Sequence, residues 1–447
     1  MGRDRAASAP AHPSRAGSGR RRPGTEARRR GVLGKLARIL GPGLITGASD
    51  DDPSGIGTYA VAGASLGLAT LWTAVVTFPL MAAVQTICAR LGLVSGRGLA
   101  GILRERHPKW IVYPAVLALV LANTINIGAD LEAIADAVGI LAGQPVKWLV
   151  VPVGLGILAV QVFASYRLIA RVFKWLTLAL LAYVIDAVIV RPDPAAVLRA
   201  TFLPTLSADK AYLTTLVAIL GTTISPYLFF WQSSQEVEEK KAHGKTRQEL
   251  RGATPTELRY STIDVTVGMG VSNAIMYFII LATALTLFAS GQTRIATAAD
   301  AAEALRPLAG DFAGFIFAAG MVGTGLLAIP ILSASAAYAV SETLGWRGGL
   351  DEKWWRARPF YAVIGAATVA GMMMDFVGIR AMDALFWTAV LNGAVAPPLL
   401  VLIMLAARDP KVMRPQPIGP ALTILGWTAT VAMFLALFGF AYTSLAS

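Results

Sequence analysis

Cysteine and histidine are nearly absent from this chain of 447 residues. Cys88 is the single cysteine, so an intramolecular disulfide framework and a cysteine-based zinc or iron–sulfur site are excluded. The three histidines, His12, His107 and His243, all lie in hydrophilic segments. A histidine-rich metal or catalytic centre within the apolar part of the chain is therefore excluded as well.

Charge is also scarce. Charged residues make up 15% of the chain, whereas soluble domains carry about 25%. Hydrophobic residues make up 55%, and the mean hydropathy is +0.60. This composition predicts an all-α integral membrane protein. Apolar stretches of spanning length predict eleven transmembrane helices, near residues 39–65, 69–91, 111–137, 147–165, 168–190, 211–235, 262–288, 311–341, 359–377, 382–406 and 418–444.

The net charge of +12 is concentrated at the N-terminus. Residues 1–38 hold ten arginines and one lysine against two acidic residues, a net charge of +9. We expect this segment to be a disordered cytoplasmic tail that anchors the topology, with no role in nucleic-acid binding. The basic loops alternate along the chain, which predicts a multi-pass protein of the plasma (inner) membrane with its N-terminus inside and its C-terminus outside.

Two of the predicted helices are interrupted near mid-depth. The stretch "GASDDDPSGIGTY", residues 47–59, puts Asp50, Asp51 and Asp52 before a proline, and "LVAILGTTISPYLFFWQ", residues 216–232, contains Pro226. Proline lacks an amide hydrogen and disfavours helical geometry in the residue before it. We expect the first helix to unwind at Asp52–Pro53–Ser54–Gly55.

The spacing of the interruptions predicts the domain organisation. Five crossings separate them, so the second set of five helices has inverted topology, which is typical of secondary transporters with a substrate site between the breaks. The expected units are residues 39–206 and 207–406 for the two repeats and 407–447 for the eleventh helix. The simpler alternatives are that Pro226 only kinks its helix, and that residues 50–52 form a turn outside the membrane. The second alternative would upset the alternation of basic loops.

The first interruption offers ligands for a metal. Carboxylates inside a membrane are costly unless they are paired or metal-bound. A carboxylate from Asp52, freed backbone carbonyls and nearby hydroxyl groups together suit a hard divalent cation. We therefore expect a divalent cation as the substrate, with no cofactor and no obligatory protein partner.

At these residues the chain resembles the NRAMP family of divalent-metal transporters, from the first to the eleventh helix. "GPGLITGASDDDPSG" and "GTTISPYLFFWQ" are similar to that family's signatures in helices 1 and 6. The resemblance implies a LeuT-type fold of 5+5 inverted repeats and alternating access. It assigns the metal-binding aspartate to Asp52 and backbone carbonyl ligands to Ser49 and Thr222.

The chain departs from the family pattern at several ligand positions. Gly55 replaces an asparagine ligand, Ser225 a methionine ligand and Tyr227 a neighbouring histidine. The glutamine of helix 10 maps near Ala389, and Asn392 lies one turn later. Losing the soft thioether favours Mg²⁺ (Mn²⁺ also accepts oxygen ligands), a pattern similar to the NRAMP-related magnesium transporters.

Polar residues of the third helix border the expected ion pathway. Asn123, Asn126 and Asp130 share one helical face, and in the family acidic residues here form a proton route, for which Glu132 is the best match. Their alternative role is hydrogen bonding between neighbouring helices. Because Tyr227 replaces the histidine, we expect uptake without proton coupling. A proton-coupled Mn²⁺/Fe²⁺ symporter of the NRAMP type is the alternative.

Other acidic residues receive smaller roles. Asp50 and Asp51 either add negative potential at the cavity or cap the following helix, and Glu236, Glu238 and Glu239 are expected at a solvated helix end.

Two rival functions remain. An amino-acid transporter of the same fold is disfavoured because Asp52 would repel a substrate carboxylate, and a membrane-embedded metal-dependent enzyme would need a second acidic motif that helix 6 does not supply.

Overall fold

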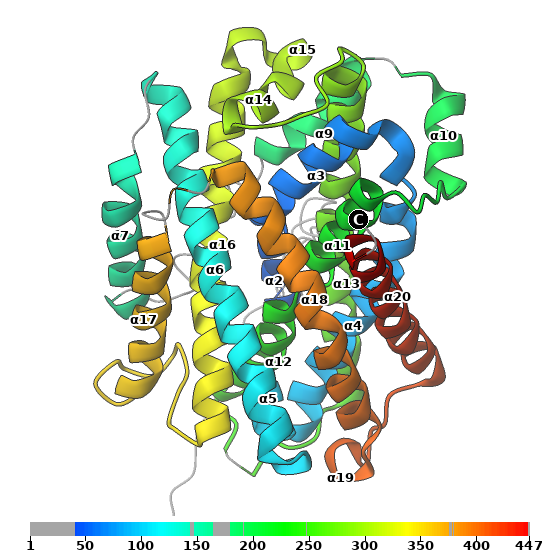
Figure 1. Ribbon diagram of the computed structural model, residues 1–447. Helices are drawn as coiled ribbons and strands as arrows, with labels where there is room; N and C mark the ends of the chain where they lie inside the picture. Colours follow the sequence, from blue (N-terminus) through cyan, green and yellow to red (C-terminus); the bar gives the residue numbers. More distant parts are fainter. Residues whose placement is uncertain are drawn as a thin grey trace, which may run out of the picture. The chain divides into compact units, whose positions relative to one another are not determined.

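The computed structural model describes residues 41–143, 147–163, 179–190, 192–246, 248–374, 378 and 380–445. All regular secondary structure within these residues is helical, which confirms the all-α expectation (Figure 1). The expected basic tail, residues 1–38, lies outside the described residues, as does the junction of the fourth and fifth predicted spans.

The first part of the chain forms ten helices within the described residues. They are α2 (Pro42–Asp50), α3 (Pro53–Leu66), α4 (Thr73–Ser95), α5 (Leu99–Arg106), α6 (Lys109–Ala142), α7 (Val150–Phe163), α9 (Leu181–Ile189), α10 (Pro194–Phe202), α11 (Lys210–Thr223) and α12 (Pro226–Ala242).

The remainder forms a second series. It comprises α13 (Pro255–Thr283), α14 (Ala298–Ala302), α15 (Arg306–Ala309), α16 (Ala313–Leu344), α17 (Arg358–Met374), α18 (Ala381–Arg408), α19 (Pro410–Met413) and α20 (Pro420–Leu445). A π-helical turn, Ala284–Phe288, extends α13.

Seven helical segments among the described residues are long and apolar enough to cross a membrane. They are Thr73–Ser95, Lys109–Ala142, Lys210–Ala242, Pro255–Phe288, Ala298–Leu344, Ala381–Arg408 and Pro420–Leu445. The other four predicted spans coincide with shorter helices: the interrupted pair α2 and α3, then α7, α9 and α17.

Local sequence signals mark several helix ends. Asp52, Asp209 and Thr254 each accept a backbone N–H at the start of α3, α11 and α13, as N-cap residues do. Proline at the first position of α3, α12 and α13 has no amide hydrogen to leave unpaired. Glycines with positive φ, Gly96 and Gly345, follow α4 and α16.

The two interruptions have nearly the same backbone geometry. Two residues separate α2 from α3, and two residues separate α11 from α12. Asp51 has φ −85° and ψ 51°, and Ile224 in the other break has φ −117° and ψ 59°. Asp52 and Ser225 follow in extended conformation, each directly before a proline that starts the next helix.

The expected extent of the first interruption is wrong. Pro53, Ser54 and Gly55 form the first turn of α3, so only Asp51 and Asp52 are non-helical. The physical reason is local: the Asp52 carboxylate accepts the Gly55 amide, and proline is favourable at the first helical position.

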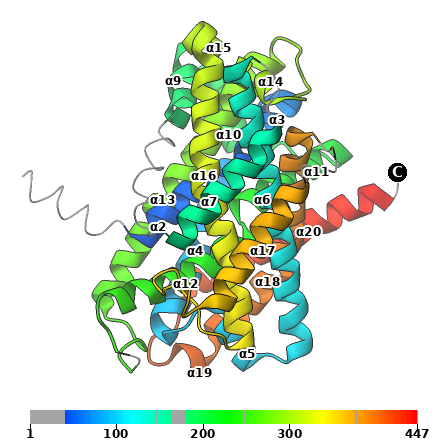
Figure 2. The ribbon, with the colours of Figure 1, turned by 90° about the vertical axis from the view of Figure 1, so that its left-hand side faces the viewer.

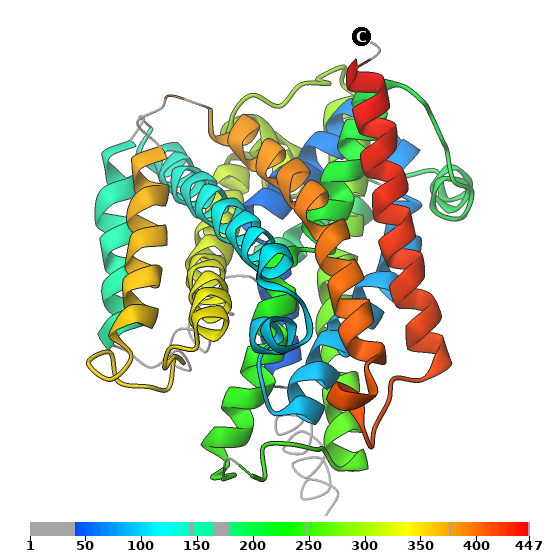
Figure 3. The ribbon, with the colours of Figure 1, turned by 60° about the horizontal axis from the view of Figure 1, so that its bottom comes forward.

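The interrupted helices lie in the interior of the bundle (Figure 1). Half-helix α2 packs on α13 and α12 packs on α4, while α3 contacts α11 and α6 packs along α16. Helix α7 lies beside α17, and α20 lies beside α18 (Figure 3). Each broken helix therefore meets the other at its gap, with α6 and α18 close by.

Glycine lets α2 approach α13 at backbone distance. A Cβ atom at Gly47 would lie 2.2 Å from the carbonyl oxygen of Gly268, and one at Gly43 would lie 2.5 Å from the amide nitrogen of Val265. Small residues at helix interfaces have this effect in membrane proteins. The position of α2, and of the gap at its end, is thus set by α13.

Candidate metal centre

Asp52 is buried at the first interruption and is held by three donors. Its Oδ1 atom accepts hydrogen bonds from Ser54 Oγ and from the Gly55 amide, both at 2.7 Å. Its Oδ2 atom accepts from Asn126 Nδ2 of α6 at 2.9 Å. The side chain is 1% exposed. The carboxylate is therefore fixed in direction by its own helix and by a neighbouring one.

Oxygen atoms from both broken helices converge beside Gly55. A Cβ atom at this residue would lie 3.0 Å from Thr222 Oγ1, 3.2 Å from the Asp50 carbonyl oxygen and 3.4 Å from Asp52 Oδ1. A larger side chain would occupy the space between these three oxygens. Glycine at this position thus lies close to a carboxylate, a hydroxyl and a carbonyl oxygen, the ligand types of hard cations.

Tyr227 connects the two half-helices α2 and α12. Its hydroxyl group donates to the Ser49 carbonyl oxygen at 2.7 Å, and its own carbonyl oxygen accepts from Ser335 of α16. Both Ser49 and Tyr227 are completely buried. The carbonyl that the resemblance assigns as a ligand is therefore engaged by a phenol in this conformation.

Ser225 engages the second expected carbonyl ligand. Its hydroxyl group lies 2.6 Å from the Thr222 carbonyl oxygen and 3.1 Å from that of Gly221, both at the end of α11. Ser225 thus satisfies carbonyl groups that the helix end leaves free. A cation bound to the Thr222 carbonyl would share it with this hydroxyl.

Asp50 and Asp51 do not cap α3, since Asp52 does so. Instead they meet Ser272 of α13, whose hydroxyl lies 2.6 Å from Asp50 Oδ2 and 3.1 Å from Asp51 Oδ1. Both carboxyl groups are buried, and Asp50 Oδ1 has no hydrogen-bond partner among the described residues. Two further carboxyl groups thus lie beside the gap. Sequence reasoning missed Ser272, whose signal was a polar residue in an apolar helix.

Helix α6, the third predicted span, brings only part of its polar face to Asp52. Asn126 reaches Asp52, whereas Asn123 donates to the Leu332 carbonyl of α16 at 2.9 Å. Asp130 is completely buried, and neither carboxyl oxygen has a hydrogen-bond partner in the described part of the chain. Glu132 is also buried and has an interaction partner.

Asn392 on α18 is a buried polar group with unused hydrogen-bonding capacity. It is 1% exposed, and neither side-chain atom has a partner within the described residues. Helix α18 touches α11 closely here, because a Cβ at Gly221 would lie 2.1 Å from the Ala389 carbonyl oxygen. The residue therefore lies on the helix that packs against one wall of the gap.

Comparison with known proteins decides the family. A family model described as natural resistance-associated macrophage protein-like matches residues 43–443. The chain belongs to the NRAMP family of divalent-metal transporters. It is therefore a member of a transporter family and not an enzyme.

Two curated NRAMP relatives extend over nearly the whole chain. The divalent metal cation transporter MntH of Deinococcus radiodurans is 27% identical over 92% of this chain and 90% of its own length. The protein of the same name from Burkholderia ambifaria is 27% identical over 95% of this chain and 92% of its own.

Solved structures confirm the LeuT-type fold. A manganese transporter of Eremococcus coleocola superposes with a TM-score of 0.69 at 16% identity, covering 92% of this chain and 87% of that one. The nucleobase-cation-symport-1 family transporter Mhp1 superposes with a TM-score of 0.53 at 12% identity, covering 90% and 93%. At these identities the likeness concerns the fold alone.

This NRAMP chain has an oxygen-rich gap. No group of three or more histidine, cysteine, aspartate or glutamate side chains in the described ranges could hold a metal ion. The atoms that converge beside Gly55 are one carboxylate, one hydroxyl and one carbonyl oxygen. A cation in the gap would therefore depend on hydroxyl and carbonyl oxygens as well as on Asp52.

Half-helix α12, the second part of the second broken helix, differs from expectation. Glu236 and Glu238 were expected at a solvated end but are 4% and 6% exposed. Glu236 Oε1 accepts from Gln232 at 3.0 Å and from Ser261 at 2.7 Å. They are buried because α12 packs on α4, α16 and α5 along its length.

Sequence reasoning also missed Asp264 of α13. Its carboxylate accepts the amides of Gly41 at 2.9 Å, Gly43 at 2.6 Å and Leu44 at 3.1 Å. Asp264 thus caps α2 from a different helix, since α2 has no side-chain cap of its own. The sequence did show a carboxylate within an apolar helix, but the amides that Asp264 caps lie more than 200 residues away along the chain.

Proposed function

We propose that this NRAMP protein imports divalent cations by alternating access at the gap between α2/α3 and α11/α12. Its substrate is Mg²⁺, and Mn²⁺ is also accepted. The curated relatives are named divalent metal cation transporters, and the Eremococcus coleocola protein is named a manganese transporter. The divalent cation is substrate rather than cofactor.

The convergence of oxygens beside Gly55 carries the proposal. Asp52 Oδ1, Thr222 Oγ1 and the Asp50 carbonyl all lie within 3.4 Å of the position that a Cβ atom of residue 55 would take. Mg²⁺ prefers oxygen ligands and retains several waters, so a widened oxygen site suits it. A soft sulfur ligand, which would favour later transition metals, is absent from this set.

The ligand set of the proposed site extends to the carbonyls of Ser49 and Thr222 and to the hydroxyl of Ser225. In this conformation Tyr227 and Ser225 donate to those carbonyls. A hydroxyl group has lone pairs as well as a proton. Rotation of these donors therefore frees the carbonyls for a cation or for its water shell.

Transport in this proposal is driven by the membrane potential without a coupled proton. Tyr227 occupies the position that the resemblance assigns to a histidine, and its hydroxyl is held by the Ser49 carbonyl. An ordinary phenol stays protonated near neutral pH, because its pKa is about 10. Inward movement of a divalent ion gains about 4.6 kcal/mol per 100 mV.

The proposed topology has two inverted repeats, residues 39–206 and 207–406, followed by 407–447. The matched geometry of the two gaps supports it, as does the equivalent packing of the second half-helices, α3 on α13 and α12 on α4. The N-terminus lies in the cytoplasm and the C-terminus outside, across the plasma membrane. Basic loops support this orientation.

Uptake by purified protein in proteoliposomes tests the function. At a fixed inside-negative potential we expect Mg²⁺ and Mn²⁺ to enter without internal acidification, and Asp52→Ala to abolish entry. Asp383→Ala is a matched control, because Asp383 pairs with Arg380 at the exposed start of α18. Entry of neither cation, or full activity of Asp52→Ala, would refute the proposal.

A proton-coupled Mn²⁺ symporter is the second candidate. The observation that favours it is the pair of buried carboxyl groups, Asp50 and Asp130, with oxygens that have no hydrogen-bond partner among the described residues. Such groups can carry protons through a membrane. In the same assay it requires Mn²⁺ entry with acidification, reduced by Asp130→Asn, and no Mg²⁺ transport.

A further inference from the structure

A large polar pocket lies at the end of the bundle that carries α5 and α19. These two helices lie together at one end, opposite α14 and α15 (Figure 2). The pocket has a volume of about 1040 Å³, and its walls come from α5, α12, α16, the loop before α13 and the start of α19. Pockets of roughly this size hold small organic ligands. None of the proposed cation ligands lines it.

The walls of the pocket carry an excess of positive charge. Seven lysine or arginine residues and three glutamates line it. Four of the basic groups form salt bridges: Arg97 with Glu105, Arg106 with Asp409, Lys241 with Glu238 and Lys245 with Glu257. Arg104, Arg251 and Lys411 have no carboxylate partner among the described residues.

Two of the three remaining basic groups contact backbone carbonyl oxygens. Arg251 donates to the Lys411 carbonyl oxygen at 2.9 Å, and Arg104 donates to that of Glu342 at 3.4 Å. These contacts satisfy N–H groups but leave the positive charges uncompensated. A concave surface with uncompensated guanidinium groups attracts anions, above all those that accept paired hydrogen bonds.

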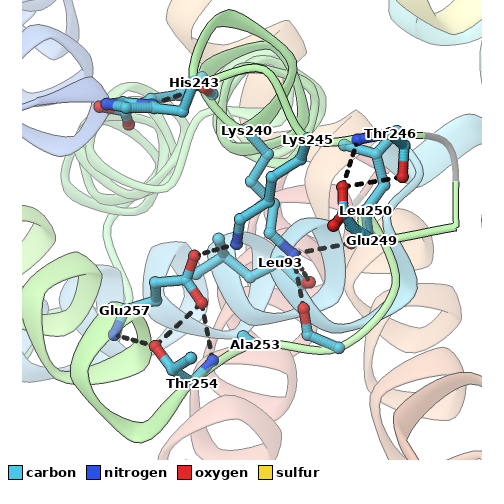
Figure 4. A network of polar contacts seen from close by, with 12 residues as sticks. Leu93, Lys240, His243, Lys245, Thr246, Glu249, Leu250, Ala253, Thr254 and Glu257 are labelled. Atoms are coloured by element: carbon cyan, nitrogen blue, oxygen red, sulfur yellow. Dashed lines mark hydrogen bonds and ion pairs between the residues drawn. The ribbon is translucent and has the colours of Figure 1, made fainter. Parts of the chain in front are cut away.

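The wall that carries Arg251 is held rigidly. Lys240, which is 4% exposed, donates to the carbonyls of Leu250 at 2.7 Å and Gly252 at 2.6 Å, the two neighbours of Arg251. It also donates to the Leu93 carbonyl near the end of α4 at 2.7 Å (Figure 4). A buried ammonium group thus fixes the backbone on both sides of Arg251, which reduces the entropy lost when a ligand binds.

The start of α5 is already occupied by a group of the protein. Glu342 accepts from the Gly101 amide at 3.1 Å and from Ser234 Oγ at 3.0 Å. A Cβ atom at Gly98 would lie 1.8 Å from this carboxylate. Gly98 therefore makes room for the Glu342 carboxylate. A bound anion would instead contact the basic groups that have no carboxylate partner.

We propose that this pocket binds a phosphate-bearing polyanion of nucleotide size. Its phosphates contact Arg104, Arg251 and Lys411, and its ring stacks on Trp346, which lines the pocket and is 44% exposed. A soluble nucleotide offers both chemistries, whereas the headgroup of an anionic lipid offers the phosphates alone. The site is independent of the transported ion, and only its cytoplasmic location rests on the proposed topology.

Equilibrium dialysis of the full-length protein with ATP and with inorganic triphosphate tests this site. The protein is held in nanodiscs of zwitterionic lipid, in chelator and without divalent cations. We expect saturable binding of both anions, weakened by about tenfold or more in the double variant Arg251→Gln, Lys411→Gln. Trp346→Leu should weaken ATP binding and leave triphosphate binding unchanged.

A matched control separates the pocket from general charge effects. Lys353→Gln removes one positive charge outside the pocket, where Lys353 lies over the Trp355 ring, and should leave binding unchanged. Nanodiscs that contain phosphatidylglycerol distinguish a soluble nucleotide from a lipid headgroup as the source of the phosphate. If the anionic lipid abolishes triphosphate binding, the phosphate site is supported and its ligand is a lipid headgroup. Absence of saturable binding, or equal weakening by Lys353→Gln, in protein that unfolds cooperatively would overturn the inference.

Discussion

At the residue scale, the proposed cation site depends on the absence of a side chain at position 55. Glycine leaves a space bounded by oxygen atoms of Asp50, Asp52 and Thr222. The neighbouring hydroxyl groups of Tyr227 and Ser225 hold the carbonyls of Ser49 and Thr222. The proposed selectivity therefore follows from the size of one side chain and from the donors around it.

Gly55→Ala should reduce Mg²⁺ uptake by about tenfold or more. The added methyl group would lie 3.0 to 3.4 Å from three oxygens and would take space from the ion and its waters. Initial uptake rates in proteoliposomes measure the effect. Gly365→Ala on α17 is the control, because a Cβ there meets nothing within 4 Å. Unchanged uptake by Gly55→Ala would place the ion elsewhere.

Tyr227→Phe should lower the KM for Mg²⁺ uptake without adding proton coupling. Removing the hydroxyl leaves the buried Ser49 carbonyl without this donor, so the carbonyl gains from binding a cation. Uptake as a function of Mg²⁺ concentration, recorded with internal pH, measures both effects. A higher KM would show that the phenol supports the site instead.

At the element scale, the position of α2 is set by α13. Asp264 caps α2 through three amides, and the glycines at 43 and 47 let the two helices touch. Helix α2 carries Ser49, Asp50 and then the gap. The first broken helix therefore depends on a residue that touches none of the proposed ligands.

Asp264→Ala should destabilise the protein by about 1–3 kcal/mol and speed hydrogen exchange at the start of α2. Three amides lose their acceptor, and loss of a helix cap has a cost of this order. Thermal unfolding and hydrogen exchange measure the change. Asp264→Asn retains one acceptor oxygen and should recover part of the loss. Equal protection of residues 41–47 in wild type and Asp264→Ala would contradict this role.

At the scale of the whole molecule, the two gaps have the same design in opposite halves of the chain. Each has two non-helical residues followed by a proline at the start of the next helix. The second half-helices pack in equivalent ways as well, α3 on α13 and α12 on α4. Inverted repeats explain both observations, and they require the two halves to cross the membrane in opposite directions.

Cysteine labelling tests the proposed orientation. Thr293→Cys lies in the exposed loop after the π-helical turn, which the topology places outside, and Lys353→Cys lies in a loop placed inside. An impermeant maleimide should label the first variant in intact cells and the second only after permeabilisation. Native Cys88 is completely buried and should not react, so wild type is the control. The reverse pattern would invert the topology.

Much of the fold could be predicted from local pattern. Apolar length predicted the membrane class and the seven spans that the described residues confirm, and the prolines at 53 and 226 marked both interruptions. The extent of the first gap was predicted wrongly, because the cap between Asp52 and Gly55 outweighs the tendency of Ser54 and Gly55 to unwind. The prediction of a solvated helix end at Glu236 and Glu238 was wrong, because helix packing and not local composition decides whether these side chains are buried.

The sequence by itself determined the membrane class, the two breaks and the position of Asp52 at the first of them. These depend on hydropathy and on interactions within a few residues, which are written in order along the chain. Only the tertiary structure decided that Asn126 contacts Asp52, that Ser272 contacts Asp50 and that Asp264 caps α2. Their contacts join residues 74 to 223 positions apart. Such contacts exist only because helix packing brings distant segments together, and no local pattern encodes which segments meet.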